Sequence, residues 1–188
     1  MPDDRRLPPG QRQVRKWPRL DLGIVPRFDP TAWNLRVDGE VDAPQRYEHN
    51  EFLSLPKVTV VSDFHCVTGW STFDNAWEGA TVRELANRAR IRGRARFATF
   101  TCADGYTTSH PLDVLYGDDV LMAYGWDGDP LPLEHGGPVR LLVPKRYAYK
   151  SAKWVQGITF TSEQVLGYWE VRGYSDTADP WTEDRYSL

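Results

Sequence analysis

Cysteine is scarce in this sequence: the 188 residues contain two, Cys66 and Cys102, which lie far apart in the chain. A chain of this length buries enough surface to fold without covalent cross-links, so a disulfide-stabilised scaffold is not expected. No apolar run approaches the roughly 18 residues that a membrane span requires. No apolar segment follows the charged N-terminus, and we therefore expect a cytoplasmic protein without a secretory signal peptide or a membrane span.

An excess of positive charge is also absent, because the formal net charge is −3. A general nucleic-acid-binding function is therefore not expected. The sequence contains no G-x-G-x-x-G fingerprint and no phosphate-binding P-loop, which argues against a dinucleotide-binding or P-loop domain. Aromatic residues, in contrast, make up 13% of the chain, enough for a packed core and for the lining of a ligand pocket.

Prolines and charged residues dominate residues 1–30. Because proline fixes φ and lacks an N–H donor, this composition predicts an extended N-terminal arm rather than a helix. Apolar side chains at Leu20, Leu22, Ile24 and Val25 could anchor the arm to the body. No linker or internal repeat divides the remainder, so residues 31–188 are predicted to form a single domain.

Short strands outnumber helices in the predicted domain. A capping box at Thr81 and Glu84 predicts a helix that ends near residue 90, and Pro56 would end a short helix over 49–55. Apolar runs and alternating patterns predict strands over 33–37, 58–64, 96–102, 120–124, 139–143 and 153–160, with the run at 58–61 buried. Because strands and helices do not alternate regularly, the expected fold class is a β-rich, mixed α+β fold.

Cys66 ends one of these strands and precedes a glycine-containing segment flanked by aromatic residues. A lone cysteine is most often a buried structural thiol, and that interpretation is the simplest one. A cysteine nucleophile would need a base such as His110 or His135. A zinc site would need closely spaced ligand pairs, which the sequence does not show. A soft metal that another scaffold already holds would need only one protein thiolate.

A basic run between residues 140 and 153 is the second notable feature. It contains no acidic residue, although the chain as a whole is acidic. Arg140 lies in an apolar strand, where an unpaired guanidinium is costly, and this predicts a phosphate or carboxylate partner. A solvated surface is the alternative interpretation of the run. Its basic residues are Arg140, Lys145, Arg146, Lys150 and Lys153.

Three motifs carry a resemblance to a known family. Residues 64–71, followed by 74–79, resemble the molybdenum-ligand segment of the sulfite oxidase family of molybdopterin enzymes. Residues 135–154 are similar to the second conserved block of that family, and residues 167–181 are similar to its closing segment. The resemblance implies a sulfite oxidase-type molybdopterin-binding fold and molybdopterin as the cofactor.

The resemblance also implies roles for individual residues. Cys66 would be the thiolate ligand of molybdenum, and Trp70 and Tyr149, with Tyr106, would line the approach of the substrate. Trp70 and Ser71 replace the arginines of the sulfite oxidases, so the chain is closer to the bacterial methionine sulfoxide reductase branch. The residues expected to bind the cofactor are His65, Thr101, His135, Arg140, Ser151, Ala152 and Lys153, with the phosphate end at 151–153.

We therefore expect a molybdenum-dependent oxidoreductase that catalyses two-electron oxygen-atom transfer on a small sulfur or nitrogen oxo compound. The absence of a haem motif predicts an external protein as electron donor or acceptor. Two alternatives stay open at this point. The first is a molybdopterin-binding protein of the same fold without redox turnover, and the second is a metal-free cysteine hydrolase that uses Cys66.

Overall fold

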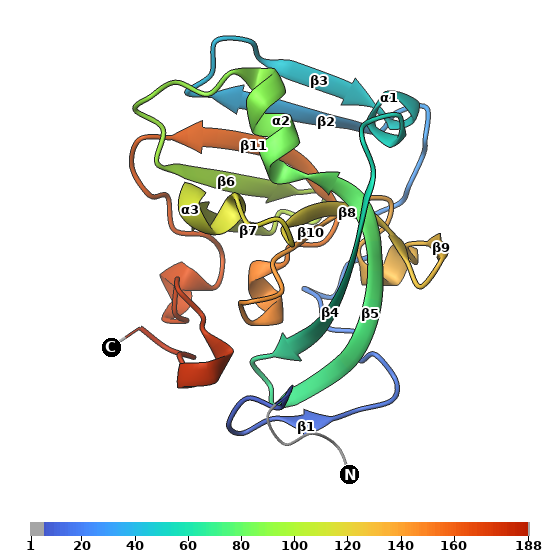
Figure 1. The fold of residues 1–188 in the computed structure, drawn as a ribbon, viewed down its shortest axis with the longest axis vertical. Coiled ribbons are helices and arrows are strands. Elements are labelled where there is room, and N and C mark those ends of the chain that lie inside the picture. The colour runs from blue at the N-terminus through green and yellow to red at the C-terminus, as the bar shows by residue number, and fades with distance from the viewer. Residues whose placement is uncertain (1–5, 188) are drawn as a thin grey trace.

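Two β-sheets organise the chain in the computed structural model, which describes residues 6–187 (Figure 1). Five strands form the first sheet, and β2 and β11 at its centre are parallel while the other neighbours are antiparallel. The strand order is β3 (Gln45–Glu48), β2 (Asn34–Gly39), β11 (Val155–Thr161), β6 (Phe97–Cys102) and β7 (Thr107–Pro111).

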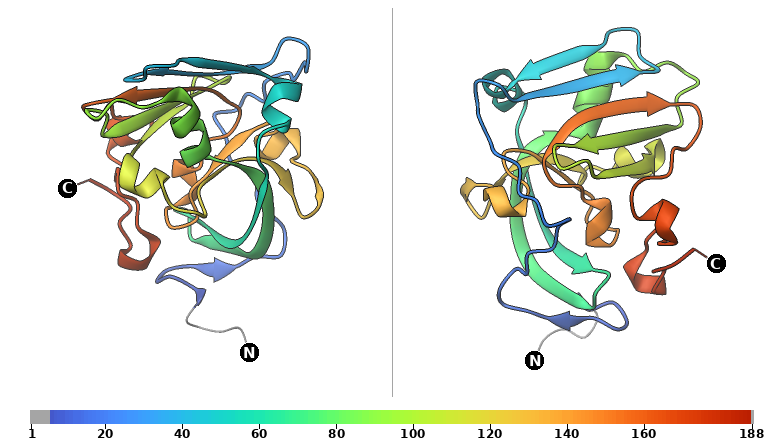
Figure 2. Two further views of the ribbon diagram at one scale, coloured as in Figure 1. Left: turned by 45° about the horizontal axis from the view of Figure 1, so that its top comes forward. Right: turned by 180° about the vertical axis from the view of Figure 1, so that it is seen from behind.

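The second sheet is built around a long curved hairpin, which descends from the first sheet in Figures 1 and 2. The hairpin consists of β4 (Val58–Cys66) and β5 (Trp70–Thr81), which pair antiparallel from Val58 opposite Gly79 to Cys66 opposite Trp70. The remaining strands are β1 (Arg12–Gln13), β8 (Leu121–Trp126), β9 (Asp129–Pro130) and β10 (Arg140–Leu142).

Helices are short. Thr81 begins α2 as predicted, since its hydroxyl accepts a hydrogen bond from the Glu84 N–H at 3.1 Å, but the Glu84 carboxylate binds Arg88 instead of completing the capping box. The α-helices are α1 (His49–Leu53), α2 (Val82–Ala89) and α3 (Leu112–Leu115), and the 3₁₀ turns are η2 (Leu133–His135), η3 (Ala148–Lys150), η4 (Glu170–Arg172) and η5 (Pro180–Thr182). The expected β-rich α+β class is confirmed. Among the described residues, no helix has the length and apolar character needed to span a membrane.

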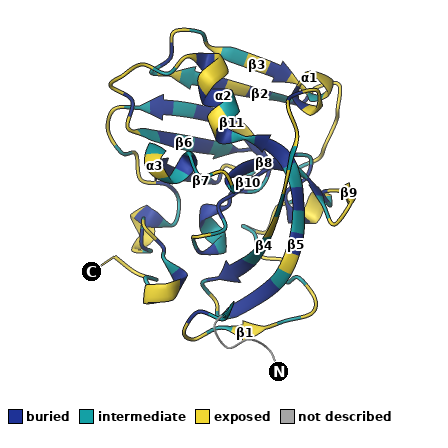
Figure 3. Cartoon of the chain, viewed as in Figure 1, coloured by how far each residue is buried: buried dark blue, intermediate teal, exposed yellow. Residues whose placement is uncertain are grey.

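Two apolar clusters form the core, and Figure 3 shows buried residues along the strands of both sheets. The larger cluster lies under the first sheet and α2, and the smaller one lies inside the curved hairpin with Phe64, Trp70 and Trp77 at its centre. The expected burial of the 58–61 run is wrong for half of its residues. Val58 and Val60 pack against the smaller cluster, whereas Val61 is 64% exposed, because alternate side chains of β4 face solvent.

The N-terminal segment lies against the body at several points. β1 adds to β5 as a parallel strand, with Arg12 opposite Trp70, and Trp17 packs into the smaller core cluster. Leu22 packs against the larger cluster, but Leu20 and Ile24 are 54% and 63% exposed and do not anchor the segment. Residues 1–5 of the predicted arm and residue 188 of the predicted domain lie outside the described residues.

Candidate functional site

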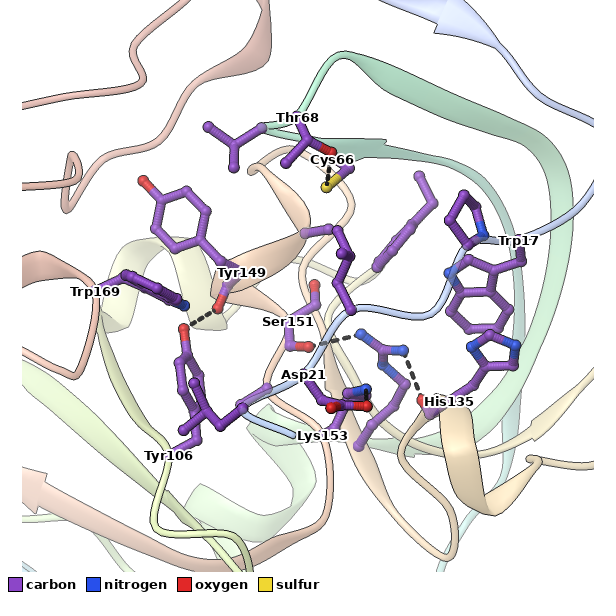
Figure 4. Close-up of a pocket in the computed structure, with 18 of the residues that line it drawn as sticks. Trp17, Asp21, Cys66, Thr68, Tyr106, His135, Tyr149, Ser151, Lys153 and Trp169 are labelled. Atoms are coloured by element: carbon purple, nitrogen blue, oxygen red, sulfur yellow. Dashed lines mark hydrogen bonds and ion pairs between the residues drawn. The ribbon is translucent and has the colours of Figure 1, made fainter. Parts of the chain in front are cut away.

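A cavity of about 340 Å³ lies where the curved hairpin meets the segment between η2 and β11 (Figure 4). Five separate parts of the chain form its walls: the N-terminal segment, the end of the hairpin, the turn between β6 and β7, the 135–153 segment and the turns before the C-terminus. Small-molecule sites typically occupy about 300–1,000 Å³, so the cavity has the size of a ligand site. Its lining includes Trp17, Asp21, Leu22, Phe64, Cys66, Thr68, Trp70, Tyr106, His135, Arg140, Tyr149, Ser151, Ala152, Lys153, Trp169 and Tyr174.

Cys66 stands at one end of this cavity (Figure 4). It is the last residue of β4, and a tight turn through Gly69, at φ +90°, returns the chain to Trp70. The Sγ atom lies 3.1 Å from the hydroxyl oxygen of Thr68, and 5% of the residue is exposed. Burial raises the pKa of the Cys66 thiol. No histidine among the described residues forms a hydrogen bond with Cys66, so the residue lacks the base that a cysteine hydrolase requires.

Both ends of the chain hold the turn that carries Cys66. The side-chain amide of Gln11 donates a hydrogen bond to the Cys66 carbonyl oxygen at 3.0 Å, and the backbone N–H of Arg12 donates to Gly69 at 3.1 Å. From the other end of the sequence, the guanidinium of Arg185 donates to the carbonyl oxygen of Val67. The backbone around the thiol is therefore fixed by three contacts distant in sequence.

Arg140 supplies a buried positive charge to the cavity wall. Its guanidinium donates to the carbonyl oxygens of His135 and Ser151, both at 2.7 Å, and lies 5.1 to 5.7 Å from the ring centres of Trp17, Phe64 and Trp77. Burial lowers its pKa. Within residues 6–187, no carboxylate forms an ion pair with this guanidinium. A buried cation without an acidic partner favours an anionic ligand in the adjoining cavity.

Lys153 lies beside Asp21 at the end of the cavity away from Cys66 (Figure 4). Its ammonium nitrogen is 3.6 Å from a carboxylate oxygen of Asp21 and donates to the carbonyl oxygen of Glu134 at 3.1 Å. Burial, together with the charge of Arg140, lowers the pKa of Lys153 to about 8. The cavity therefore has a thiol at one end and two basic groups at the other.

Aromatic side chains form much of the remaining wall. The Trp17 ring is stacked on His135 with centroids 3.9 Å apart and planes inclined by 4°. On the opposite side, the Tyr106 hydroxyl donates to the carbonyl oxygen of Tyr149 at 2.6 Å, and Trp169 packs edge-on against Tyr174 at 5.2 Å. Such flat surfaces suit a planar heterocycle or an apolar substrate.

The structure brings most of the predicted site residues together. Nine of them line the cavity: Cys66, Trp70, Tyr106, His135, Arg140, Tyr149, Ser151, Ala152 and Lys153. His65 and Thr101 are outside the lining. His65 Nδ1 lies 2.8 Å from the Ser71 hydroxyl oxygen, and its ring packs against Trp181. Thr101 is on β6, where its hydroxyl faces the backbone of Gly157.

The basic run, however, does not form a single anion site. Only Arg140 and Lys153 reach the cavity. Lys150 is buried elsewhere and pairs with Glu170 at 2.5 Å, while the exposed Lys145 lies 3.5 Å from Asp119. The density of basic residues in the sequence therefore overestimated the number of cations in the site, because neighbouring side chains point in different directions.

Sequence reasoning missed the contribution of the N-terminal segment. Trp17 and Asp21 line the cavity although they belong to a stretch without any periodic pattern. Thr68, Trp169 and Tyr174 also line it, and the motifs at 64–71 and 167–181 contained these three. Within residues 6–187, no cluster of three or more His, Cys, Asp or Glu side chains could hold a metal by itself.

Comparison with known proteins gives consistent similarities. The model of the oxidoreductase molybdopterin-binding domain matches residues 22–169. The uncharacterized oxidoreductase YuiH of Bacillus subtilis (strain 168) is 40% identical over 97% of this chain and 92% of its own length. The protein-methionine-sulfoxide reductase catalytic subunit MsrP of Ralstonia nicotianae is 32% identical, and the match covers 76% of this chain and 47% of MsrP.

One solved structure shares the fold. The sulfane dehydrogenase SoxCD of Paracoccus pantotrophus superimposes with a TM-score of 0.69 at 20% identity. The match covers 75% of this chain and 41% of the SoxCD chain. The chain therefore spans nearly the whole of the Bacillus relative but less than half of the Ralstonia and Paracoccus proteins.

Proposed function

This chain belongs to the family of oxidoreductase molybdopterin-binding domains, and we propose that Cys66 is the protein ligand of the molybdenum in its molybdopterin cofactor. The family makes it a molybdenum-dependent oxidoreductase with the sulfite oxidase-type fold, which confirms the expected enzyme class, fold and cofactor. The observation that carries the proposal is the position of the Cys66 thiol in a cavity whose other end is basic.

The cavity fits the cofactor in size and in chemistry. Its volume of about 340 Å³ suits one small organic cofactor. The cofactor ends in a phosphate, and the buried Arg140, which has no acidic partner among residues 6–187, and Lys153 offer positive charge to that group. The nearby Trp17 and His135 rings offer flat surfaces to the pterin. Cys102, the other cysteine, is buried outside the cavity lining.

When bound, molybdopterin supplies a molybdenum ion capable of two-electron oxygen-atom transfer, while the protein supplies position and electrostatics. Cys66 would have to lose its Sγ proton to act as a ligand; burial raises the pKa of the thiol, and a bound metal would favour the thiolate. The Thr68 hydroxyl, 3.1 Å from Sγ, can then donate a hydrogen bond to the thiolate. The contacts of Gln11 and Arg185 fix the backbone on either side.

The substrate is proposed to be a neutral sulfoxide or N-oxide rather than the sulfite anion. Val67, Trp70 and Tyr149 surround the cysteine end of the cavity with apolar and aromatic surface. Arg185, whose charge acts on the Cys66 thiol, already donates to the carbonyl oxygen of Val67 and lies 3.5 Å from the carboxylate of Glu183. The relatives named as methionine sulfoxide reductases act on a neutral S-oxide, in agreement with this arrangement. An external protein would deliver the electrons.

A pair of cysteine variants tests this proposal. Cys66→Ser should abolish reduction of methionine sulfoxide and dimethyl sulfoxide by a reduced dye, while the pterin released per chain stays close to wild type. Cys102→Ser is the matched control, because it changes a buried cysteine outside the cavity lining, and it should retain activity. Both proteins are made in a host that synthesises the cofactor. Full activity of Cys66→Ser, or wild-type protein without molybdenum, would refute the assignment.

A further inference from the structure

Asp21 holds an unusual position for an acidic residue in an irregular segment. Its side chain is only 7% exposed, and its carboxylate lies 3.6 Å from the ammonium of Lys153 inside the cavity lining (Figure 4). It also accepts hydrogen bonds from the Arg19 guanidinium at 2.5 Å and from the Gly23 N–H at 2.8 Å. Two cations therefore share one carboxylate at the basic end of the cavity.

This carboxylate occupies the position that an anionic ligand of Lys153 would take. An ammonium group has three donors, and one of them is already used by the carbonyl oxygen of Glu134. A phosphate placed beside Lys153 would meet the negative charge of Asp21 at a distance of a few ångströms, in a partly buried site where such repulsion is weakly screened. The Asp21 carboxylate and a bound phosphate would therefore repel each other if both stayed close to Lys153.

We propose that Asp21 competes with the phosphate of the cofactor for Lys153, and that the segment 19–21 withdraws its carboxylate when the phosphate binds. This inference rests on the proposed function, because it takes the basic end of the cavity as the phosphate site. Asp21 is then a built-in competitor that weakens anion binding and neutralises Lys153 when no phosphate is present.

The surrounding segment is built for a small movement of this kind. Trp17 is fixed on one side, since it stacks on His135 and packs edge-on against Phe64 and Trp77. On the other side, Leu20 is 54% exposed, and Leu22 packs against the larger core cluster immediately after Asp21. Residues 19–21 therefore lie between two packed positions, Trp17 and Leu22, and withdrawal of Asp21 moves its carboxylate and the exposed Leu20 while both packed residues stay in place.

Inorganic phosphate is the probe for this competition. Titration calorimetry on the full-length chain, made in a host without the cofactor, compares wild type with Asp21→Asn. Removal of one negative charge beside the ammonium should tighten phosphate binding about tenfold. Asp29→Asn is the matched control, because it removes the same charge from the same segment at a residue that caps Thr31 and lies outside the cavity lining. It should bind phosphate like wild type, and Lys153→Ala should bind it at least tenfold more weakly.

Limited proteolysis provides a second readout. If phosphate displaces Asp21 from Lys153, trypsin should cut after Arg19 several-fold faster with phosphate than without it. This acceleration should be lost in Lys153→Ala. Three results would each overturn the inference. Asp21→Asn could bind phosphate with the affinity of wild type, Asp29→Asn could also bind it more tightly, or none of the proteins could bind it. The proposed function is judged separately, by the molybdenum content and the Cys66→Ser result, and it survives any of these outcomes if the metal and its thiolate dependence are found.

Discussion

The Gln11 side chain and the Cys66 backbone are joined by a hydrogen bond of 3.0 Å between residues 55 positions apart in the sequence. The same amide group accepts a hydrogen bond from the Ser71 hydroxyl at 3.1 Å, so Gln11 connects the two strands of the hairpin end. This contact comes from the N-terminal segment and reaches the residue that we propose as the metal ligand. The segment therefore contributes to the precision of the site as well as to the wall of the cavity.

Gln11→Ala should lower the free energy of unfolding by about 2 kcal/mol, because it removes two intramolecular hydrogen bonds that usually contribute about 1 kcal/mol each. In a chain of this length the thermal midpoint should fall by about 4–8 °C. Gln13→Ala is the control, since Gln13 is exposed on β1, which directly follows Gln11, and its side chain forms no hydrogen bond with the described residues. Thermal unfolding followed by circular dichroism measures both variants. Equal midpoints for the two would show that the Gln11 contact contributes nothing.

The pH dependence of anion binding should report the charge of Lys153. Because the pKa of this lysine is about 8, its positive charge is lost as the pH rises through that value. Affinity for a phosphate monoester should therefore fall above pH 8, by up to about tenfold per pH unit. The ligand does not cause this fall, since a monoester with a second pKa of about 6 is already a dianion at these pH values.

Lys153→Arg is the matched variant for this measurement, because arginine keeps its charge throughout the range. Its affinity should fall much less than that of wild type between pH 7.5 and 8.5, a range that ends below the pKa of about 9 to which burial lowers Arg140. Stability should change in the opposite direction. Between about 8 and the ordinary value of 10.5, the unfolded state binds more protons than the folded state, so the destabilisation caused by burying the charge of Lys153 is relieved as the pH rises. Identical pH profiles for phosphate binding in the two proteins would exclude Lys153 as the titrating group.

Much of the fold could be predicted from local pattern. The alternation at 33–37 and the Thr81 cap predicted β2 and α2 correctly, because in both cases one face of the element packs on the core. β7 (Thr107–Pro111) was missed, since its buried residues are Thr108, Ser109 and His110 rather than apolar side chains. The hydrogen bonds of the buried Thr108 and His110 side chains come from Glu170 and Lys150, which are distant in sequence, and a local pattern does not show such partners.

The residues of the candidate site also fall into those that could be predicted from local sequence and those that could not. Cys66, Arg140 and Lys153 could be found from motifs, because the residues around them are close in sequence. Trp17 and Asp21 reach the cavity only through the path of the N-terminal segment across the body, which no periodicity encodes. The directions of the side chains could not be predicted from the sequence either. The η3 turn directs Lys150 into the protein, whereas Lys153 faces the cavity.

The buried pair Lys150 and Glu170 allows a last prediction. Their side chains are 0% and 1% exposed, and the ammonium lies 2.5 Å from the carboxylate. Lys150 also donates to the Ser109 carbonyl oxygen at 2.7 Å, and the Thr108 hydroxyl donates to Glu170 at the same distance. The pair thus joins β7 to η3, which precedes β11, and to η4, which follows it; the cavity residues Tyr149 and Trp169 are the chain neighbours of Lys150 and Glu170.

Lys150→Met should lower the free energy of unfolding by about 3–5 kcal/mol, because it leaves the Glu170 carboxylate buried without its cation. Replacement of both partners, Lys150→Met with Glu170→Leu, should recover most of this loss, since no buried charge then remains. Urea unfolding of the wild type, the two single variants and the double variant gives the coupling free energy directly. A double variant as unstable as the sum of the single variants would show that the two residues act independently, and would remove the pair as the connection between β7 and the cavity wall.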